Sequence, residues 1–159
     1  LRVAGNLPYN ISSPILFQCL DHLDAIEDMH FMLQKEVVDR MAAGPGSKTY
    51  GRLSVMVQLA CRVEPLIAVP PAAFRPPPKV DSMVVRLLPR PLQERPVAHA
   101  AAIARVVRAA FGQRRKTLSN ALGELLDSEQ IAACGIDPRN RAEQLAPAEF
   151  VALARALAP

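Results

Sequence analysis

The sequence has 159 residues, half of them hydrophobic, and a formal net charge of +4. A chain of this size can bury a core as one medium-sized domain, or as part of a domain followed by a small second one. It shows no signal peptide and no apolar run near the roughly 20 residues of a membrane span, so we expect a cytoplasmic protein without a membrane partner.

The first 88 residues alternate between apolar runs, which predict strands, and segments of helical spacing. Strands are expected at residues 1–5, 29–33, 63–69 and 82–88, and helices at residues 14–23, 34–43 and 53–61. Ser12 or Ser13 should cap the first helix. Residues 70–81 are too few for a crossover helix, so the last two strands should be antiparallel. This order is that of the second half of an α/β sheet, and because the first run begins at residue 1 we expect further chain upstream.

A proline-rich linker, residues 89–97, separates residues 1–88 from a second part. Residues 98–159 are alanine-rich with helical spacing of apolar side chains, so they predict a small all-helical domain. Helices are expected at residues 103–111, 118–126 and 139–144, and a last one begins at Pro147.

Positive charge is concentrated near the middle of the chain. Residues 89–123 carry seven Lys and Arg against one acidic residue, whereas residues 1–88 carry nine against eight. Such clustering favours a polyanion partner over a general effect on solubility.

Cysteine and histidine positions argue against a metal centre. Cys19, Cys61 and Cys134 are far apart and form no Cys-x-x-Cys pair, and the three histidines have no ligand-like spacing. An odd number of isolated cysteines favours free thiols in a reducing compartment over a disulfide framework. We therefore predict no metal site.

The segment Asn6-Leu7-Pro8-Tyr9 follows the first predicted strand and predicts a binding loop. Pro8 keeps Leu7 out of the helical region and has no N–H, so the backbone is stiff and its carbonyls can accept hydrogen bonds. The Asn6 side-chain oxygen and the Leu7 carbonyl can accept both N–H groups of an exocyclic amine, while Tyr9 stacks on the base. Fixed dipoles of this kind stabilise the charge that develops during methylation of an amine. The alternative is an ordinary turn after a strand.

A second unusual stretch runs from Phe74 to Ser82 and contains three consecutive prolines. The prolines predict a stiff, extended loop between two strands. Phe74 would then form a second wall, opposite Tyr9, for a base flipped out of its stack. The alternative is that Phe74 fills the core.

Arg114, Arg115 and Lys116 precede the helix expected at residues 118–126. Cations at a helix N-terminus oppose the helix dipole, and a bound phosphate would compensate for them. We interpret the triplet as a contact to an RNA backbone, and the alternative is a solvated basic turn. The same track would include four further cations, Arg75, Lys79, Arg105 and Arg108.

Together these motifs resemble the ribosomal RNA adenine N6-dimethyltransferase family of the KsgA type. The resemblance extends from Val3 to about Leu157 and rests on five segments. They are Asn6 to Ser12, Met32 to Val37, Tyr50 to Val55, Phe74 to Ser82 and Phe111 to Thr117. The resemblance implies the C-terminal half of a Rossmann-like class I methyltransferase sheet, followed by the helical domain. It also implies a set of catalytic residues, Asn6, Leu7, Pro8, Tyr9 and Phe74.

The resemblance further implies S-adenosylmethionine as the methyl donor. The implied substrate is a pair of adjacent adenines near the 3′ end of 16S ribosomal RNA, in the assembling small subunit, and we expect a monomer. Relatives hold the donor with an upstream glycine-rich turn and an acidic residue, whereas here only Asn6 remains of the donor-contacting positions. The chain alone is therefore expected to be inactive.

Two other functions stay open. One is a non-catalytic RNA-binding or ribosome-assembly module, because the basic segment is complete. The other, weaker one is a DNA adenine methyltransferase, whose loop usually has a second proline at the position of Leu7.

Overall fold

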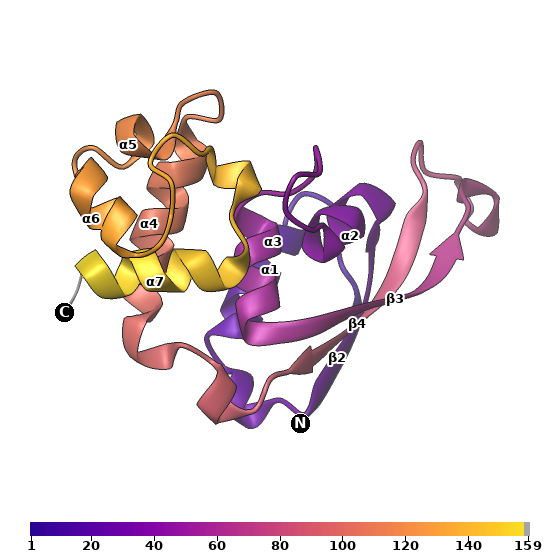
Figure 1. Cartoon of the computed structure of the whole chain (residues 1–159). Helices are drawn as coiled ribbons and strands as arrows, with labels where there is room; N and C mark the ends of the chain where they lie inside the picture. The colour runs from indigo at the N-terminus through magenta and orange to yellow at the C-terminus, as the bar shows by residue number, and fades with distance from the viewer. Residues whose placement is uncertain (158–159) are drawn as a thin grey trace.

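The computed structural model describes residues 1–157, and its four strands form one mixed sheet (Figure 1). The strands are β1 (Arg2–Asn6), β2 (Asp28–Gln34), β3 (Cys61–Val69) and β4 (Ser82–Pro89), in the spatial order β1-β2-β4-β3. β1 and β2 are parallel, and β4 runs antiparallel to both of its neighbours. The prediction of four strands with an antiparallel final pair is therefore confirmed.

Three helices lie on one face of this sheet (Figure 1). They are α1 (Ser12–Leu20), α2 (Lys35–Ala42) and α3 (Arg52–Ala60). The sequence of β2 explains the covered face, because successive side chains of a strand point to opposite sides. Met29, Phe31 and Leu33 are at most 2% exposed and form the core with apolar side chains of the three helices.

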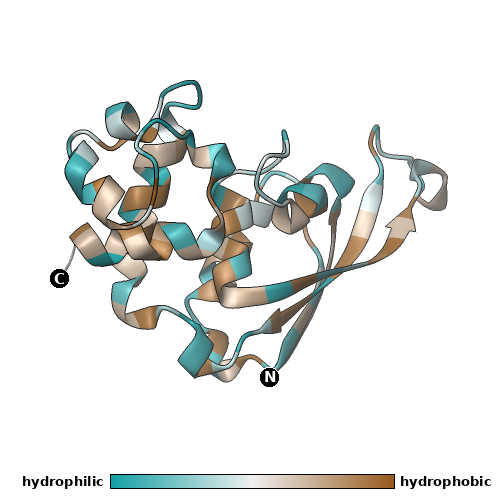
Figure 2. Cartoon of the chain, in the orientation of Figure 1, coloured by the Kyte–Doolittle hydropathy of each residue, from teal (hydrophilic) through white to brown (hydrophobic). Residues whose placement is uncertain are grey.

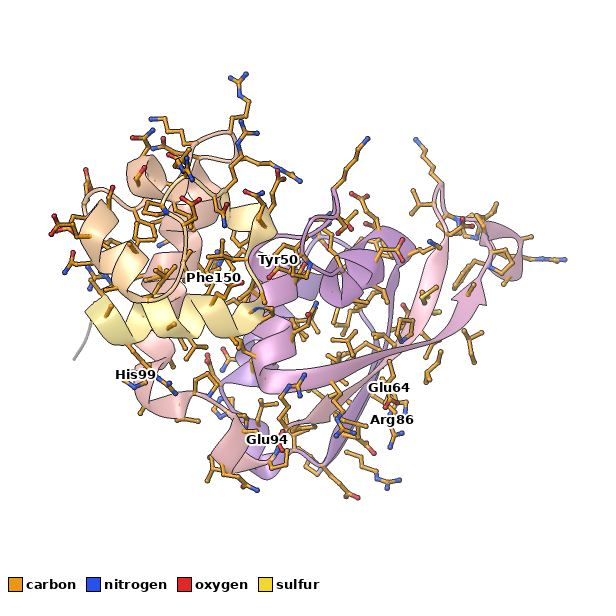
Figure 3. All side chains as sticks on the ribbon, viewed as in Figure 1. Tyr50, Glu64, Arg86, Glu94, His99 and Phe150 are labelled. Atoms are coloured by element: carbon orange, nitrogen blue, oxygen red, sulfur yellow. The ribbon has the colours of Figure 1, made fainter. Side chains whose placement is uncertain are left out.

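The opposite face of the sheet has no helix of residues 1–157 on it (Figure 1). In the centre of this face Arg86 of β4 pairs in register with Glu64 of β3, and its guanidinium lies 3.4 Å from the Glu64 carboxylate (Figure 3). The outer end of β3, brown and beige in Figure 2, carries Leu66 and Ile67, which are 48% and 59% exposed. The open face thus mixes ion pairs with apolar side chains.

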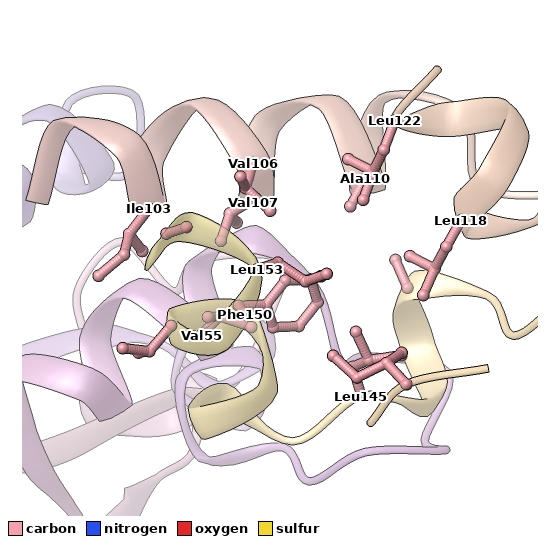
Figure 4. Packing of buried hydrophobic residues seen from close by; sticks show 14 of the residues in the cluster. Val55, Ile103, Val106, Val107, Ala110, Leu118, Leu122, Leu145, Phe150 and Leu153 are labelled. Atoms are coloured by element: carbon pink, nitrogen blue, oxygen red, sulfur yellow. The ribbon is translucent and has the colours of Figure 1, made fainter. Parts of the chain in front are cut away.

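The C-terminal part consists of helices around a core of their own (Figure 4). They are α4 (Ala100–Gly112), α5 (Leu118–Ala121), α6 (Ser128–Ala133) and α7 (Pro147–Leu157). Ile103, Val107 and Ala110 recur at helical spacing on α4, and this apolar face packs in one cluster with Phe150 and Leu153 of α7. The predicted last helix, beginning at Pro147, is confirmed.

Two helix predictions in this part are wrong. The helix expected at residues 118–126 ends at Ala121, where the chain turns before Gly123, and the helix expected at residues 139–144 is only a 3₁₀ turn. The structure places α6 between them. A capping box defines its start, because Asp127 Oδ1 accepts the Gln130 N–H at 2.8 Å and Gln130 Oε1 accepts the Asp127 N–H at 2.9 Å.

The loop between α2 and α3 connects the two cores. The Tyr50 side chain is 1% exposed inside the helical core, and its hydroxyl donates to the Leu145 carbonyl at 2.6 Å. The Gly46 N–H donates to the Glu143 carbonyl at 2.7 Å. The division into two domains and a linker stays a prediction, and these contacts show that its two parts pack against each other.

Candidate functional site

The two loops singled out by the sequence leave the sheet at the same edge. Asn6 is the last residue of β1 and pairs in register with Met32. Ser82, the first residue of β4, pairs with Gln34 at the end of β2 and with Val69 at the end of β3. The carboxyl ends of three strands and the start of the fourth therefore meet at one edge, which is where open α/β sheets bind ligands.

Hydrogen bonds at both ends hold Tyr9 at this edge. Its hydroxyl oxygen lies 2.9 Å from Ser82 Oγ, and its carbonyl accepts the Ser12 hydroxyl at 3.3 Å. The preceding Leu7 is anchored in the core, and its N–H donates to the Met32 carbonyl at 3.2 Å. The Tyr9 side chain is nevertheless 40% exposed, so its ring is available to a ligand.

The predicted cap of the first helix is wrong. α1 begins at Ser12, and the residue before it, Ile11, provides no side-chain cap. The Ser12 hydroxyl is directed to Tyr9 instead, which makes this serine part of the loop's support. Serine side chains can bond to nearby backbone in either way, so the sequence alone does not distinguish the two.

Phe74 lies between β3 and β4, directly after the 3₁₀ turn Pro71–Ala73. Its N–H donates to the Pro71 carbonyl at 3.1 Å, and its side chain is half-buried outside both hydrophobic cores. Arg75 and Lys79 are exposed on the same loop, which extends away from the helical part in Figure 1. The placement of Phe74 opposite Tyr9 stays a prediction.

The predicted RNA-contacting cations of the helical part are all exposed. They are Arg105 and Arg108 on α4, and Arg114, Arg115 and Lys116 in the turn after it. The α5 helix that follows has only four residues, so the triplet faces a short turn rather than the dipole of a full helix. Its charge is better described as an exposed basic turn, as accessible to phosphate as the sequence predicted.

A cleft of about 650 Å³ separates this basic turn from the sheet. Arg40, Lys48, Arg52 and Arg114 line it, and the Arg114 guanidinium donates to the Lys48 carbonyl. The Arg52 guanidinium lies 5.1 Å from the centre of the Phe17 ring, so one wall offers both a cation and an aromatic face. Sequence reasoning missed the first three cations, because the nearly neutral charge of residues 1–88 conceals a local excess.

The cysteines have no catalytic features. All three are free, and burial raises the pKa of the Cys61 thiol to about 12 and also raises that of Cys19. Such thiols stay protonated near neutral pH and are poor nucleophiles. Among residues 1–157 no group of three His, Cys, Asp or Glu side chains is placed to hold a metal, and none of the described helices is long and apolar enough to cross a membrane.

A model of the family described as ribosomal RNA adenine dimethylase matches residues 1–158. This chain belongs to that family. The resemblance inferred from the sequence motifs is thereby confirmed, and so is the Rossmann-like methyltransferase fold that it implied.

Curated relatives agree with this assignment. Ribosomal RNA small subunit methyltransferase A of Xanthomonas campestris pv. campestris (strain B100) is 63% identical over 97% of the chain, and that of Xanthomonas euvesicatoria pv. vesicatoria (strain 85-10) is 62% identical. The chain spans 59% of the length of each of these relatives.

Two solved structures share the fold. A dimethyladenosine transferase from Plasmodium falciparum superposes with a TM-score of 0.80 at 27% identity, over 96% of this chain and 65% of that one. The 23S rRNA methyltransferase ErmE gives a TM-score of 0.72 at 24% identity over 100% of this chain and 66% of that one, a likeness of fold alone.

Proposed function

We propose that this chain is the adenine-binding and RNA-binding portion of an S-adenosylmethionine-dependent ribosomal RNA adenine N6-dimethyltransferase. Its substrate would be two adjacent adenines near the 3′ end of 16S ribosomal RNA in the assembling small subunit, and it would act as a monomer in the cytoplasm. The observation that carries the proposal is the Asn6-to-Tyr9 loop, which is held at the ligand-binding edge of the sheet with the Tyr9 ring exposed.

The loop can position an adenine amine for methylation. The Asn6 side chain is exposed at the end of β1, where its oxygen can accept one N6 hydrogen. The Pro8 carbonyl already accepts the Ile11 N–H at 3.2 Å, which leaves the Leu7 carbonyl as the backbone acceptor for the second hydrogen. Two acceptors draw the amine lone pair out of conjugation with the ring. Tyr9 then stacks on the base, and these dipoles stabilise the positive charge that develops on nitrogen.

S-adenosylmethionine would supply the methyl group, and this chain does not form its site alone. Asn6 is the one donor-contacting residue that the family resemblance places in residues 1–157, and it is exposed at the end of a strand that pairs only with β2. One side-chain amide cannot replace the hydrogen bonds that the donor's amino-acid, ribose and adenine groups lose on leaving water. The remaining length of the relatives would complete the site.

The basic surface supports the RNA part of the proposal. The cleft lined by Arg40, Lys48, Arg52 and Arg114 continues into the exposed turn at residues 114–116. Neutralising several phosphates along such a track gives affinity without sequence preference, and the adenine pocket adds the preference.

An RNA hairpin tests the adenine pocket in this chain. Filter binding compares a hairpin from the 3′ end of the small-subunit RNA with the same hairpin in which both adjacent adenines are uridines. We expect the adenine hairpin to bind more tightly. Equal affinity would remove the adenine pocket and favour the second candidate, a non-catalytic assembly module, which the complete basic cleft would serve equally well.

Methyl transfer is measured in a chimaera. The Xanthomonas campestris relative supplies the part of its length that this chain does not span, and the acceptor is small subunits lacking the two dimethyladenines. Transfer of labelled methyl groups to both adenines is the expected result, and a chimaera that is folded and binds the donor but transfers nothing would refute the catalytic role.

A further inference from the structure

We propose that Ser82 is a positioning residue for the target base, acting through the hydroxyl of Tyr9. The proposal rests on the proposed function, in which the Tyr9 ring stacks on the adenine. It adds that the ring's orientation is set by a side chain 73 positions away in the sequence.

Ser82 is a rigid support. Its side chain is 1% exposed, and its backbone pairs with Gln34 on one side and Val69 on the other. The oxygen-to-oxygen distance to the Tyr9 hydroxyl is 2.9 Å, well within the range of a hydroxyl–hydroxyl hydrogen bond. A buried residue in the middle of a sheet therefore holds the outer end of a side chain that is 40% exposed.

The second anchor of Tyr9 makes this bond decisive for the ring. The Ser12 hydroxyl holds the Tyr9 carbonyl at 3.3 Å, so the backbone of the residue is fixed independently. With the backbone fixed, only rotation about the side-chain bonds remains, and the bond to Ser82 restricts it. A ring already oriented for stacking loses less conformational freedom when the base arrives.

The same bond links the two loops of the site. Ser82 directly follows the loop that carries Phe74 and Lys79, and Tyr9 ends the loop that carries Asn6. A shift of the first loop at its junction with β4 would therefore move the Tyr9 ring as well. Ser82 fixes one wall of the base pocket in relation to the other.

Four variants of the full chain test this role by filter binding to the adenine and uridine hairpins. Ser82→Ala and Tyr9→Phe each remove the hydrogen bond, their combination tests whether the two effects are one, and Ser82→Thr keeps a hydroxyl. We expect each single variant to lower the preference for the adenine hairpin by about threefold to tenfold, the range of one neutral hydrogen bond. The double variant should lose no more than the single ones, and Ser82→Thr should retain the preference. Ser128→Ala, at an exposed position on α6, is the matched control.

A spectroscopic readout separates orientation from general stability. The chain has only two tyrosines, so carbon-13 labelling of the tyrosine ring gives two NMR signals, which Tyr50→Phe assigns. Ser82→Ala should move the Tyr9 signal and leave that of Tyr50 in place. If Ser82→Ala and Tyr9→Phe both keep the full adenine preference, the positioning role is overturned while the proposed function stands. If the unchanged chain shows no preference, the proposed function fails and takes this role with it.

Discussion

Asn6 has the most demanding task of any single residue in the proposed site, because its side-chain oxygen must accept a hydrogen from the amine that is being methylated. In the methylating chimaera, Asn6→Ala should lower the single-turnover rate by about 10² to 10³, the usual effect of removing one preorganised dipole. RNA affinity should change little, because the phosphate contacts lie elsewhere. Asn10→Ala, an exposed amide in the same stretch, is the control. A near-normal rate for Asn6→Ala would contradict the assigned role.

Tyr50 contributes to folding rather than to the site. Tyr50→Phe leaves the buried Leu145 carbonyl without its partner, which should reduce the free energy of unfolding by about 1–3 kcal/mol. Urea denaturation measures this loss. Tyr9→Phe, which removes a hydroxyl from an exposed side chain, should cost less, and equal losses would mean that burial of the Tyr50 bond adds nothing.

The same residue predicts a dependence on alkaline pH. Burial, and to a smaller extent the nearby Glu149 carboxylate, raise the pKa of Tyr50 to about 12. In the unfolded chain the phenol loses its proton near its ordinary pKa of about 10, so between pH 10 and 12 the folded state holds more protons. Its contribution is complete below about pH 10 and is lost as the pH rises toward 12. The decline should be shallower in Tyr50→Phe.

Among the helices, α6 depends most on its cap, since six residues are too few to be stable by propensity alone. Asp127→Ala removes the side chain that accepts the Gln130 N–H and should lower stability by about 0.5–2 kcal/mol. Glu129→Ala, at an exposed position inside the same helix, is the control for a change of charge. Thermal unfolding of the two variants should separate them by several degrees, and identical midpoints would show that the capping box is not needed.

The elements that local pattern determines were predictable, and those that distant contacts determine were not. The run from Met29 to Leu33 alternates between the covered and open faces, so β2 could be identified from its own residues. At residues 139–144 helical spacing was misleading, whereas Asp127 and Gln130, three positions apart, were a usable signal for α6 that the periodicity did not capture.

The candidate site divides in the same way. Sequence motifs identified the loops that carry Tyr9 and Phe74, because proline and aromatic residues give each loop a local signal. The support of Tyr9 by Ser82 spans 73 positions, and the cleft gathers Arg40, Lys48, Arg52 and Arg114 from separate segments. Neither follows from spacing along the chain, because both depend on how the sheet and the helices pack.

For the molecule as a whole, the basic turn should dominate salt-dependent binding. Replacing Arg114, Arg115 and Lys116 by alanine should reduce the slope of log affinity against log salt by up to about three contacts, at roughly 0.7–0.9 per contact. Filter binding at several salt concentrations measures the slope. A control with the same change of net charge replaces three exposed arginines away from the turn, Arg2, Arg62 and Arg155. An equal reduction in both variants would indicate a general charge effect instead of a track.

The loop between α2 and α3 is tied to the helical part by the Gly46 N–H on the Glu143 carbonyl, the Tyr50 hydroxyl on the Leu145 carbonyl, and Arg114 on the Lys48 carbonyl. These ties fix the separation between the basic turn and the sheet edge, so the molecule should act as a ruler that counts nucleotides. Inserting one nucleotide between the target adenines and the phosphates held by the turn should abolish the adenine preference. Salt-dependent affinity should persist, because a rigid ruler can still grip either end of a strand whose length no longer matches.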